Sequence, residues 1–172
     1  MPDTILPLEL VRKAEEVVAA NRRAGRTIAV AESCTGGLVS AAITEIPGSS
    51  EVFDAGFITY SNDMKNEVLK VSHDVLDTFG AVSIATAWAM AQGALEKSHA
   101  HVAVAITGVA GPGGGSDNKP VGTVVFARAE KGGSPDNVVA DMRHFEDNGR
   151  GGVRLQAALC ALDLLLPDSS AP

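Results

Sequence analysis

The chain has 172 residues, of which 45% are hydrophobic and 20% are charged, and this composition excludes an intrinsically disordered or fibrous protein. Its net charge of -7 excludes broad contact with a nucleic-acid backbone, and we find neither a signal peptide nor an apolar run of membrane-spanning length. We therefore expect one cytoplasmic domain, 1–172, that binds no nucleic acid and no membrane. Its core should span about 8–166, with a short flexible tail at 167–172.

Hydrophobic periodicity predicts helices and strands that alternate along most of the chain. In chain order they are helix 8–24, strand 27–31, helix 36–46, strand 52–60, helices 62–69, 74–79 and 84–98, strand 102–107, a glycine-rich loop 108–119, strands 121–129 and 138–145, and helix 151–166. Two adjacent strands late in the chain add an antiparallel pair to the alternating pattern. We expect an α/β protein, a three-layer α/β/α sandwich around a mixed, mainly parallel sheet.

The first candidate site lies where the first strand passes into a helix. Residues 31–37 read Ala-Glu-Ser-Cys-Thr-Gly-Gly, so Ser33 stands just before the helix. Free N–H groups and the helix dipole favour an anion there, and residues 34–37 could bind an oxyanion or a phosphate. Cys34 is a rival nucleophile, because a helix N-terminus lowers the pKa of a thiol. A plain helix cap at Ser33 or Thr35 fits the same spacing.

The second candidate site is the segment that contains Tyr60 and Lys65. Tyr60 is the only tyrosine and ends a predicted strand, whereas Lys65 falls in the first turn of the next helix. The helix dipole and partial burial both lower the pKa of a lysine at this place, so a neutral Lys65 could be a general base for a serine. Tyr60 could relay the proton or bind the oxyanion. The alternative is a solvated lysine beside a half-buried tyrosine.

The third candidate is the glycine-rich loop 108–119, which leaves the carboxyl end of the clearest strand, where open α/β sheets bind ligands. It could wrap a phosphate and a ribose or close as a lid, and a flexible surface hairpin is the alternative. Arg150 and Arg154 begin the last helix, where a cation is unfavourable unless an anion is near. Both a phosphate contact and a solvated helix face fit these arginines.

Cysteine and histidine spacing favours neither a metal site nor a disulfide framework. Cys34 and Cys160 are the only cysteines, and the four histidines form no metal-binding motif. His99 and His101 share one side of the chain beside a strand, a placement that is usually structural. We expect no metal and no cofactor.

Several long motifs occur in an order and spacing that resemble the CinA C-terminal domain family across roughly 8–166. They are Ala31-Glu32-Ser33-Cys34-Thr35-Gly36-Gly37, Pro47-Gly48-Ser49-Ser50, Gly56-Phe57-Ile58-Thr59-Tyr60-Ser61-Asn62 with Lys65, Gly80-Ala81-Val82-Ser83, Ile106-Thr107-Gly108-Val109-Ala110-Gly111-Pro112 and Lys119-Pro120-Val121-Gly122-Thr123-Val124. The resemblance is to the stand-alone form, without the N-terminal nucleotide-hydrolysing domain of longer members.

This resemblance implies a nicotinamide-nucleotide amidohydrolase, which converts nicotinamide mononucleotide (NMN) to nicotinate mononucleotide and ammonia. We also expect a homo-oligomer. The family's catalytic serine, lysine and tyrosine match Ser33, Lys65 and Tyr60, and its threonine after the central strand matches Thr107. We expect the substrate-binding residues to be Cys34, Thr35, Gly36, Gly37, Thr107, Gly108, Gly111 and Arg150.

One segment departs from the family pattern. Many members read Gly-Asp-Arg before the last helix, whereas this chain reads Asn148-Gly149-Arg150, so the arginine is retained and the acid is not. Two other functions remain open at this point: a catalytically silent nucleotide-binding regulatory module, and an amidase for another small amide.

Overall fold

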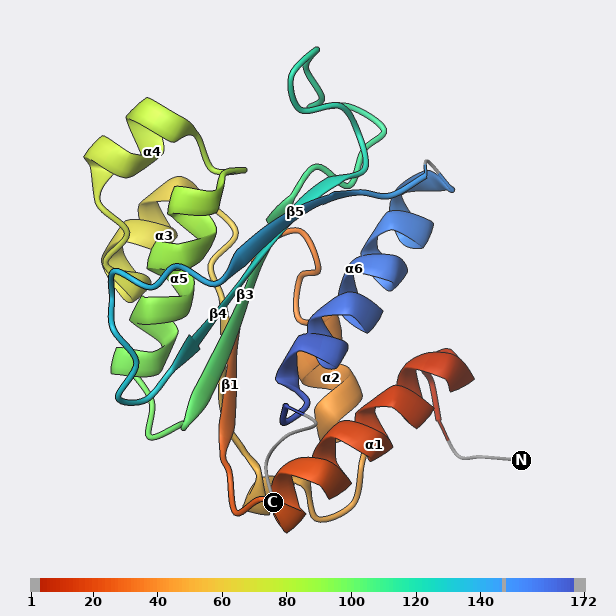
Figure 1. The fold of residues 1–172 in the computed structure, drawn as a ribbon. Coiled ribbons are helices and arrows are strands. Elements are labelled where there is room, and N and C mark those ends of the chain that lie inside the picture. The colour runs from red at the N-terminus through yellow and green to blue at the C-terminus, as the bar shows by residue number, and fades with distance from the viewer. Residues whose placement is uncertain (1–3, 147, 169–172) are drawn as a thin grey trace.

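A computed structural model describes residues 4–146 and 148–168, so the predicted tail lies outside the described residues from 169 onward (Figure 1). The elements are α1 (Leu8–Arg23), β1 (Ile28–Glu32), α2 (Leu38–Thr44), the 3-10 helix η1 (Ser49–Glu51), β2 (Phe53–Ile58), α3 (Asn62–Leu69), α4 (His73–Phe79), α5 (Ile84–Glu96), β3 (Val102–Gly108), β4 (Thr123–Glu130), β5 (Ala140–His144) and α6 (Gly149–Leu165). Each predicted helix and strand is present.

The sheet has the order β2-β1-β3-β4-β5, in which β1 lies parallel to β2 and β3, while β4 and β5 are antiparallel. Helices α1, α2 and α6 cover one face, and α3, α4 and α5 lie on the other (Figure 1). The predicted α/β/α sandwich around a mixed sheet is therefore confirmed. No helix in residues 4–146 or 148–168 combines the length and the apolar character that crossing a membrane requires.

Alternation along the central strands divides the core in two. Ile28 and Val30 of β1 face α1, α2 and α6, whereas Ala29 and Ala31 face α5. The small alanines let α5 lie close to the sheet, as the period-two pattern of a strand allows. Helix α5 also contacts α3 closely, since a Cβ at Gly93 would lie 2.1 Å from the Leu69 carbonyl oxygen. This contact fixes the height of α3 above the sheet.

The parallel strands end at one edge of the sheet. Glu32 is in register with Ile58 of β2 and with Ile106 of β3. The residues that follow these three positions therefore meet at one edge, where ligands bind in open α/β sheets. Two predicted boundaries were wrong here. Helix α2 begins at Leu38 rather than 36 because Gly36 and Gly37 have positive φ angles, and β2 ends at Ile58, before Tyr60.

Candidate active site

Ser33 and Lys65 form a buried pair at this edge. The Ser33 N–H donates to the Ile106 carbonyl at 2.9 Å, which keeps the residue in line with β3. Lys65 lies in the first turn of α3, which begins at the Ser61 cap. The Lys65 side chain is only 1% exposed, and its Nζ lies 3.0 Å from Ser33 Oγ. The alternative of a solvated lysine is therefore wrong.

The surroundings of Lys65 orient its amine toward Ser33. Nζ donates to the Thr59 carbonyl at 2.9 Å and to the Tyr60 carbonyl at 3.1 Å. Because a carbonyl oxygen only accepts hydrogen bonds, these two contacts use two N–H bonds of Lys65. A neutral amine has only two N–H bonds, so its lone pair then faces Ser33 Oγ. Burial lowers the pKa of Lys65, and no ion pair joins it to a carboxylate within residues 4–146 and 148–168. The pair thus has the geometry of a nucleophile with its base.

Cys34 has the opposite electrostatics. The side chain is 5% exposed, and burial, together with the negative charge of Glu32, raises the pKa of the thiol to about 11. The prediction that the helix end lowers this pKa was wrong, because desolvation outweighs the helix field. At neutral pH Cys34 is a thiol, which is a poor nucleophile.

The N-terminus of α2 is already occupied by the carboxylate of Glu32, a residue to which the sequence motifs gave no role. The buried carboxylate of Glu32 accepts hydrogen bonds from the N–H groups of Gly37 (3.1 Å) and Val39 (3.1 Å), and the Gly36 N–H donates to the Ser33 carbonyl. The expectation of free N–H groups throughout residues 34–37 was therefore wrong for both glycines. The sequence signal that could have predicted this cap is the acidic residue Glu32 at the end of the strand that precedes the helix.

Two N–H groups of the 34–37 segment remain available. In the described part of the chain, the Cys34 and Thr35 amides make no hydrogen bond to another residue. Arg154 of α6 instead binds the carbonyls of the same two residues, at 3.2 Å from Nε to Cys34 O and 2.9 Å from Nη2 to Thr35 O. Arg154 is thus a structural contact of the Ser33 loop and does not lie on a solvated helix face.

Arg150 connects two other loops at the same edge. Its Nη1 donates to the Gly111 carbonyl at 2.7 Å, and its Nη2 donates to the Tyr60 hydroxyl at 2.9 Å. Tyr60 is 59% exposed and contacts Lys65 through its backbone carbonyl, whereas its phenol faces Arg150. The Tyr60 phenol makes no hydrogen bond to Lys65, so no direct path for a proton connects the two side chains. The catalytic role of Tyr60 therefore stays a prediction.

A pocket of about 300 Å³ opens over the Ser33–Lys65 pair. The predicted residues that line it are Ser33, Cys34, Tyr60, Lys65, Thr107, Gly108, Gly111 and Arg150, whereas Thr35, Gly36 and Gly37 lie outside its lining. Ala81 and Val82 also line it, and the sequence assigned them no role. Thr107 Oγ1 donates to the Ala81 carbonyl at 2.8 Å, which joins the end of β3 to the loop before α5.

Packing against β4 requires a glycine at position 108, which also lines the pocket. A Cβ at this position would lie 2.8 Å from Val124 Cγ2 and 2.9 Å from the Thr123 carbonyl oxygen. Glycine is therefore needed where β3 passes β4. Whether Gly108 also contacts a ligand stays a prediction.

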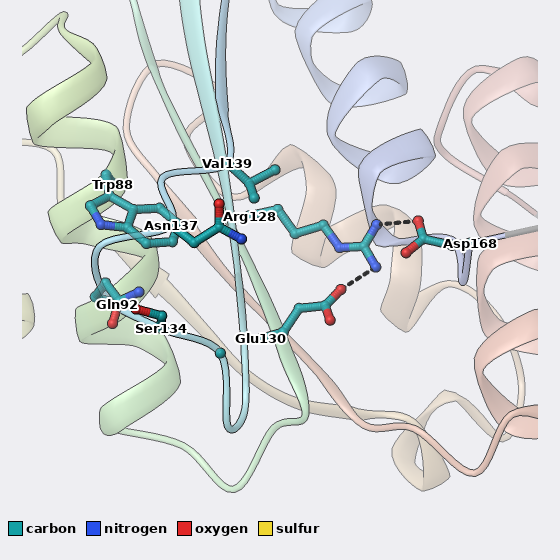
Figure 2. Close-up of a pocket in the computed structure, with 9 residues that line it drawn as sticks. Trp88, Gln92, Arg128, Glu130, Ser134, Asn137, Val139 and Asp168 are labelled. Atoms are coloured by element: carbon teal, nitrogen blue, oxygen red, sulfur yellow. Dashed lines mark hydrogen bonds and ion pairs between the residues drawn. The ribbon is translucent and has the colours of Figure 1, made fainter. Parts of the chain in front are cut away.

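A second pocket, of about 280 Å³, lies between α5, β4 and the loop before β5 (Figure 2). Arg128 on its wall is paired with both Glu130 and Asp168, the latter at 3.1 Å, and Trp88 Nε1 donates to the Pro135 carbonyl. Its charges are paired, and its lining contains no serine with a lysine or histidine base. We therefore assign the candidate chemistry to the pocket at Ser33.

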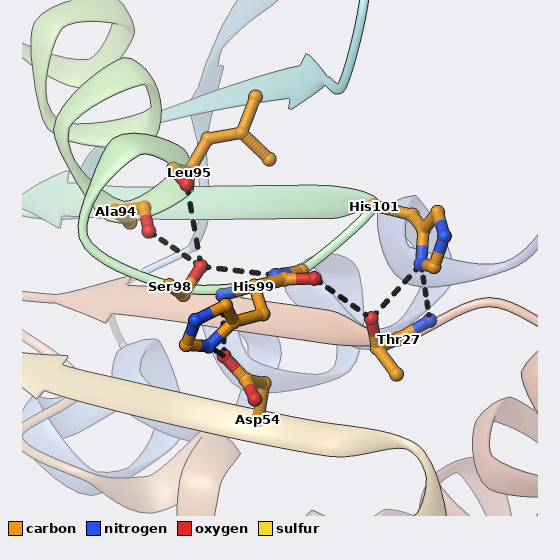
Figure 3. A network of polar contacts seen from close by, with 8 residues as sticks. Thr27, Asp54, Ala94, Leu95, Ser98, His99 and His101 are labelled. Carbon is orange, nitrogen blue, oxygen red and sulfur yellow. Dashed lines mark hydrogen bonds and ion pairs between the residues drawn. The ribbon is translucent and has the colours of Figure 1, made fainter.

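His99 and His101 lie at the opposite end of the sheet, where β1 and β3 begin (Figure 3). The Thr27 N–H donates to His101 Nδ1 at 3.0 Å, and the His99 N–H donates to Asp54 Oδ2 at 2.7 Å. Within the ranges that the structure describes, no three or more His, Cys, Asp or Glu side chains are grouped to hold a metal ion. The two histidines therefore have structural contacts: His101 binds the segment before β1, and His99 binds Asp54 of β2.

The fold and this pocket define an α/β protein with a buried serine–lysine pair at the carboxyl edge of its parallel strands. The CinA C-terminal domain family matches residues 11–168, so the chain belongs to this family, as the resemblance predicted.

The relatives agree in sequence and in structure. The chain is 48% identical to nicotinamide-nucleotide amidohydrolase PncC of Enterobacter agglomerans (88% of this chain, 90% of that protein) and 45% identical to that of Escherichia coli K12 (91% and 93%). A putative competence-damage inducible protein of Symbiobacterium thermophilum is 49% identical over 82% of this chain, which spans 34% of that longer relative. The crystal structure of competence/damage inducible protein CihA from Agrobacterium tumefaciens superposes with a TM-score of 0.89 at 46% identity, covering 94% of this chain and 96% of that one.

Proposed function

We propose that the chain is a nicotinamide-nucleotide amidohydrolase that converts NMN to nicotinate mononucleotide and ammonia with a Ser33–Lys65 dyad. The observation that carries the proposal is the buried contact of 3.0 Å between Lys65 Nζ and Ser33 Oγ, at the base of a pocket of nucleotide-binding size. The PncC relatives, which this chain matches over most of both lengths, support the substrate. A homo-oligomer and a cytoplasmic location stay predictions.

Acylation begins with a proton transfer from Ser33 to neutral Lys65. As the proton leaves, Ser33 Oγ forms a bond to the carboxamide carbon, and the carbonyl becomes an oxyanion. The N–H group of Cys34, which lines the pocket, is the candidate donor to this oxyanion, and such a donor contributes about 3 kcal/mol in comparable sites. The Gly36 and Gly37 amides take no part, because Ser33 and Glu32 already use them.

Ammonia leaves in the next step. The oxyanion re-forms the carbonyl, the C–N bond breaks, and protonated Lys65 returns its proton to the departing amine. Water then attacks the resulting ester while Lys65 accepts one of its protons. Collapse of this second intermediate releases the carboxylate and restores the Ser33 hydroxyl, so no metal or cofactor is needed.

The ribose phosphate is assigned to the end of β3, to the loop that follows it and to Arg150. Thr107 gives its own hydroxyl proton to the Ala81 carbonyl, so toward a ribose hydroxyl it acts as an acceptor. Among the described residues, the hydrogen-bond partners of the Arg150 guanidinium are the Gly111 carbonyl and the Tyr60 hydroxyl, which are both uncharged, so its charge can be offered to a phosphate. Glu32 fills the N-terminus of α2, so the phosphate is assigned to Arg150 rather than to that helix end.

Ammonia release from NMN tests the proposal directly. We expect turnover with NMN and formation of nicotinate mononucleotide, measured by an ammonia-coupled assay and chromatography. A panel of small amides is the comparison. Ammonia from another amide and none from NMN would make the chain a different amidase, and calorimetric binding of NMN without ammonia release would identify a silent nucleotide-binding module.

Replacing Arg150 with methionine should raise KM for NMN by about 10- to 100-fold, because a hydrogen bond to a charged group contributes roughly 1.5–3 kcal/mol. The kcat value should change little, since Arg150 does not touch Ser33 or Lys65. Steady-state ammonia release measures both constants. The matched control is the nucleoside that lacks the phosphate, whose kinetics should be nearly the same for both proteins. An equal loss with both substrates would contradict a phosphate role.

A further inference from the structure

We propose that Glu32 is a positioning residue for Ser33, whose carboxylate holds the nucleophile loop in the geometry that reaction with Lys65 requires. The proposal rests on Ser33 being the nucleophile, and it adds a residue that no motif assigned. Glu32 is the last residue of β1 and directly precedes Ser33, and its side chain is fully buried.

The Glu32 carboxylate is hydrogen-bonded on both oxygens. Oε2 accepts from the N–H groups of Gly37 and Val39, each at 3.1 Å. Oε1 accepts from the N–H and the hydroxyl of Ser40, each at 2.8 Å. The side chain thus reaches across the turn and joins the end of β1 to the first turn of α2.

Burial makes this arrangement hard to distort. A buried carboxylate is strongly unfavourable unless it is paired or hydrogen-bonded, and no ion pair of Glu32 occurs within 4–146 and 148–168. The compensation comes from the α2 amides, the positive end of the helix dipole and the Ser40 hydroxyl. Any shift of α2 relative to β1 would leave this charge without donors.

The loop between these two anchors is held from a second direction. The Thr59 N–H donates to the Glu32 carbonyl at 3.0 Å, which fixes the end of β1, and the two carbonyl contacts of Arg154 hold the middle of the loop from α6. Ser33 therefore lies between anchors on β1, α2 and α6. The contact of 3.0 Å with Lys65 depends on them, because a displacement of about 1 Å can cost on the order of 100-fold in rate.

The same contacts argue against a direct part for Glu32 in proton transfer. Lys65 Nζ has Ser33 Oγ and the carbonyls of Thr59 and Tyr60 as its partners, and Glu32 is not among them. Both Glu32 oxygens are used by α2. Its effect on Ser33 is therefore one of geometry.

The test measures how fast Ser33 reacts with a fluorophosphonate probe, which needs no NMN. Ser33 Oγ bonds to phosphorus, fluoride leaves, and the hydroxyl proton passes to Lys65. We expect Glu32→Gln to slow labelling of Ser33 by about 10-fold or more, because its amide NH₂ would face an N–H donor. With NMN, kcat should fall by a similar factor and KM should stay within about twofold. The pH at which labelling is half-maximal should not move, since Lys65 keeps its surroundings.

Two further variants keep the test decisive. Ser40→Ala removes one donor to Glu32 and retains α2, so it should slow labelling by a smaller factor even if Glu32→Gln does not fold. Ser72→Ala is the matched control, because it removes a cap from α4, whose residues do not line the pocket, and it should label at the wild-type rate.

Each other outcome has a definite meaning. Wild-type labelling rates in Glu32→Gln and Ser40→Ala would overturn the proposal, as would equal slowing by Ser72→Ala, which would indicate general destabilisation. A shifted pH midpoint with an unchanged maximal rate would mean that Glu32 acts by charge, which also overturns it. If wild-type Ser33 is labelled but NMN releases no ammonia, the substrate proposal fails and the role of Glu32 stands. If the probe does not label Ser33 and no amide releases ammonia, both proposals fail.

Discussion

Ser33→Ala should abolish deamidation of NMN, with a loss in kcat of about 10³-fold or more, as when the nucleophile of other serine hydrolases is removed. Without Oγ no acyl ester can form, and Lys65 has no hydroxyl to deprotonate. The fold should be retained, because Ser33 is anchored to Ile106 through its backbone N–H and not through its hydroxyl. Ammonia release measures the loss, and mass spectrometry of the quenched wild-type reaction should detect the ester on Ser33.

Cys34→Ala is the matched control for this prediction. The thiol lies beside Ser33 and lines the same pocket, but burial keeps it protonated, with its pKa raised to about 11. We therefore expect activity within about threefold of wild type, since a protonated thiol contributes little as a nucleophile. Near wild-type deamidation in Ser33→Ala, combined with its loss in Cys34→Ala, would transfer the nucleophile to Cys34.

The sequence predicted the layers, the strands and the Ser33 region because these depend on local patterns. Val30 and Ala31 point to opposite faces simply by their alternation. The helix predicted from residue 36 begins only at Leu38, because Gly36 and Gly37 both have positive φ angles. The family motif also selected Lys65, but periodicity alone could not separate it from a solvated lysine. Its burial depends on how close α3 lies to the sheet, which is set by Gly93 in a different helix.

The contacts that the sequence could not predict join residues far apart in the chain. Arg154 and Cys34 are 120 positions apart, and Arg150 and Tyr60 are 90 apart. Such pairs follow from the packing of α6 against the sheet edge, and no local pattern encodes them. The pKa of Cys34 was mispredicted for a similar reason, because the helix end is visible in the sequence whereas the depth of burial is not.

Lys65→Met should lower kcat by about 10²- to 10⁴-fold, the range that a positioned general base contributes. The methionine fills the buried volume but supplies no proton acceptor, and it leaves the Thr59 and Tyr60 carbonyls without their N–H donors. Circular dichroism and thermal unfolding should accompany the kinetics, so that the loss is read from folded protein. Unchanged turnover in this variant would remove the dyad from the mechanism.

The pH dependence of the activity should also report the protonation state of Lys65. Only neutral Lys65 accepts the Ser33 proton, so activity should rise with pH until Lys65 is deprotonated and then level off. Because burial lowers the pKa of Lys65, the midpoint of kcat/KM should lie below the ordinary value for lysine. Lys65→Arg separates base from charge, since arginine keeps N–H donors and a positive charge but has no lone pair to offer. We expect it to be as inactive as Lys65→Met, and an active arginine variant would mean that Lys65 acts only through its charge.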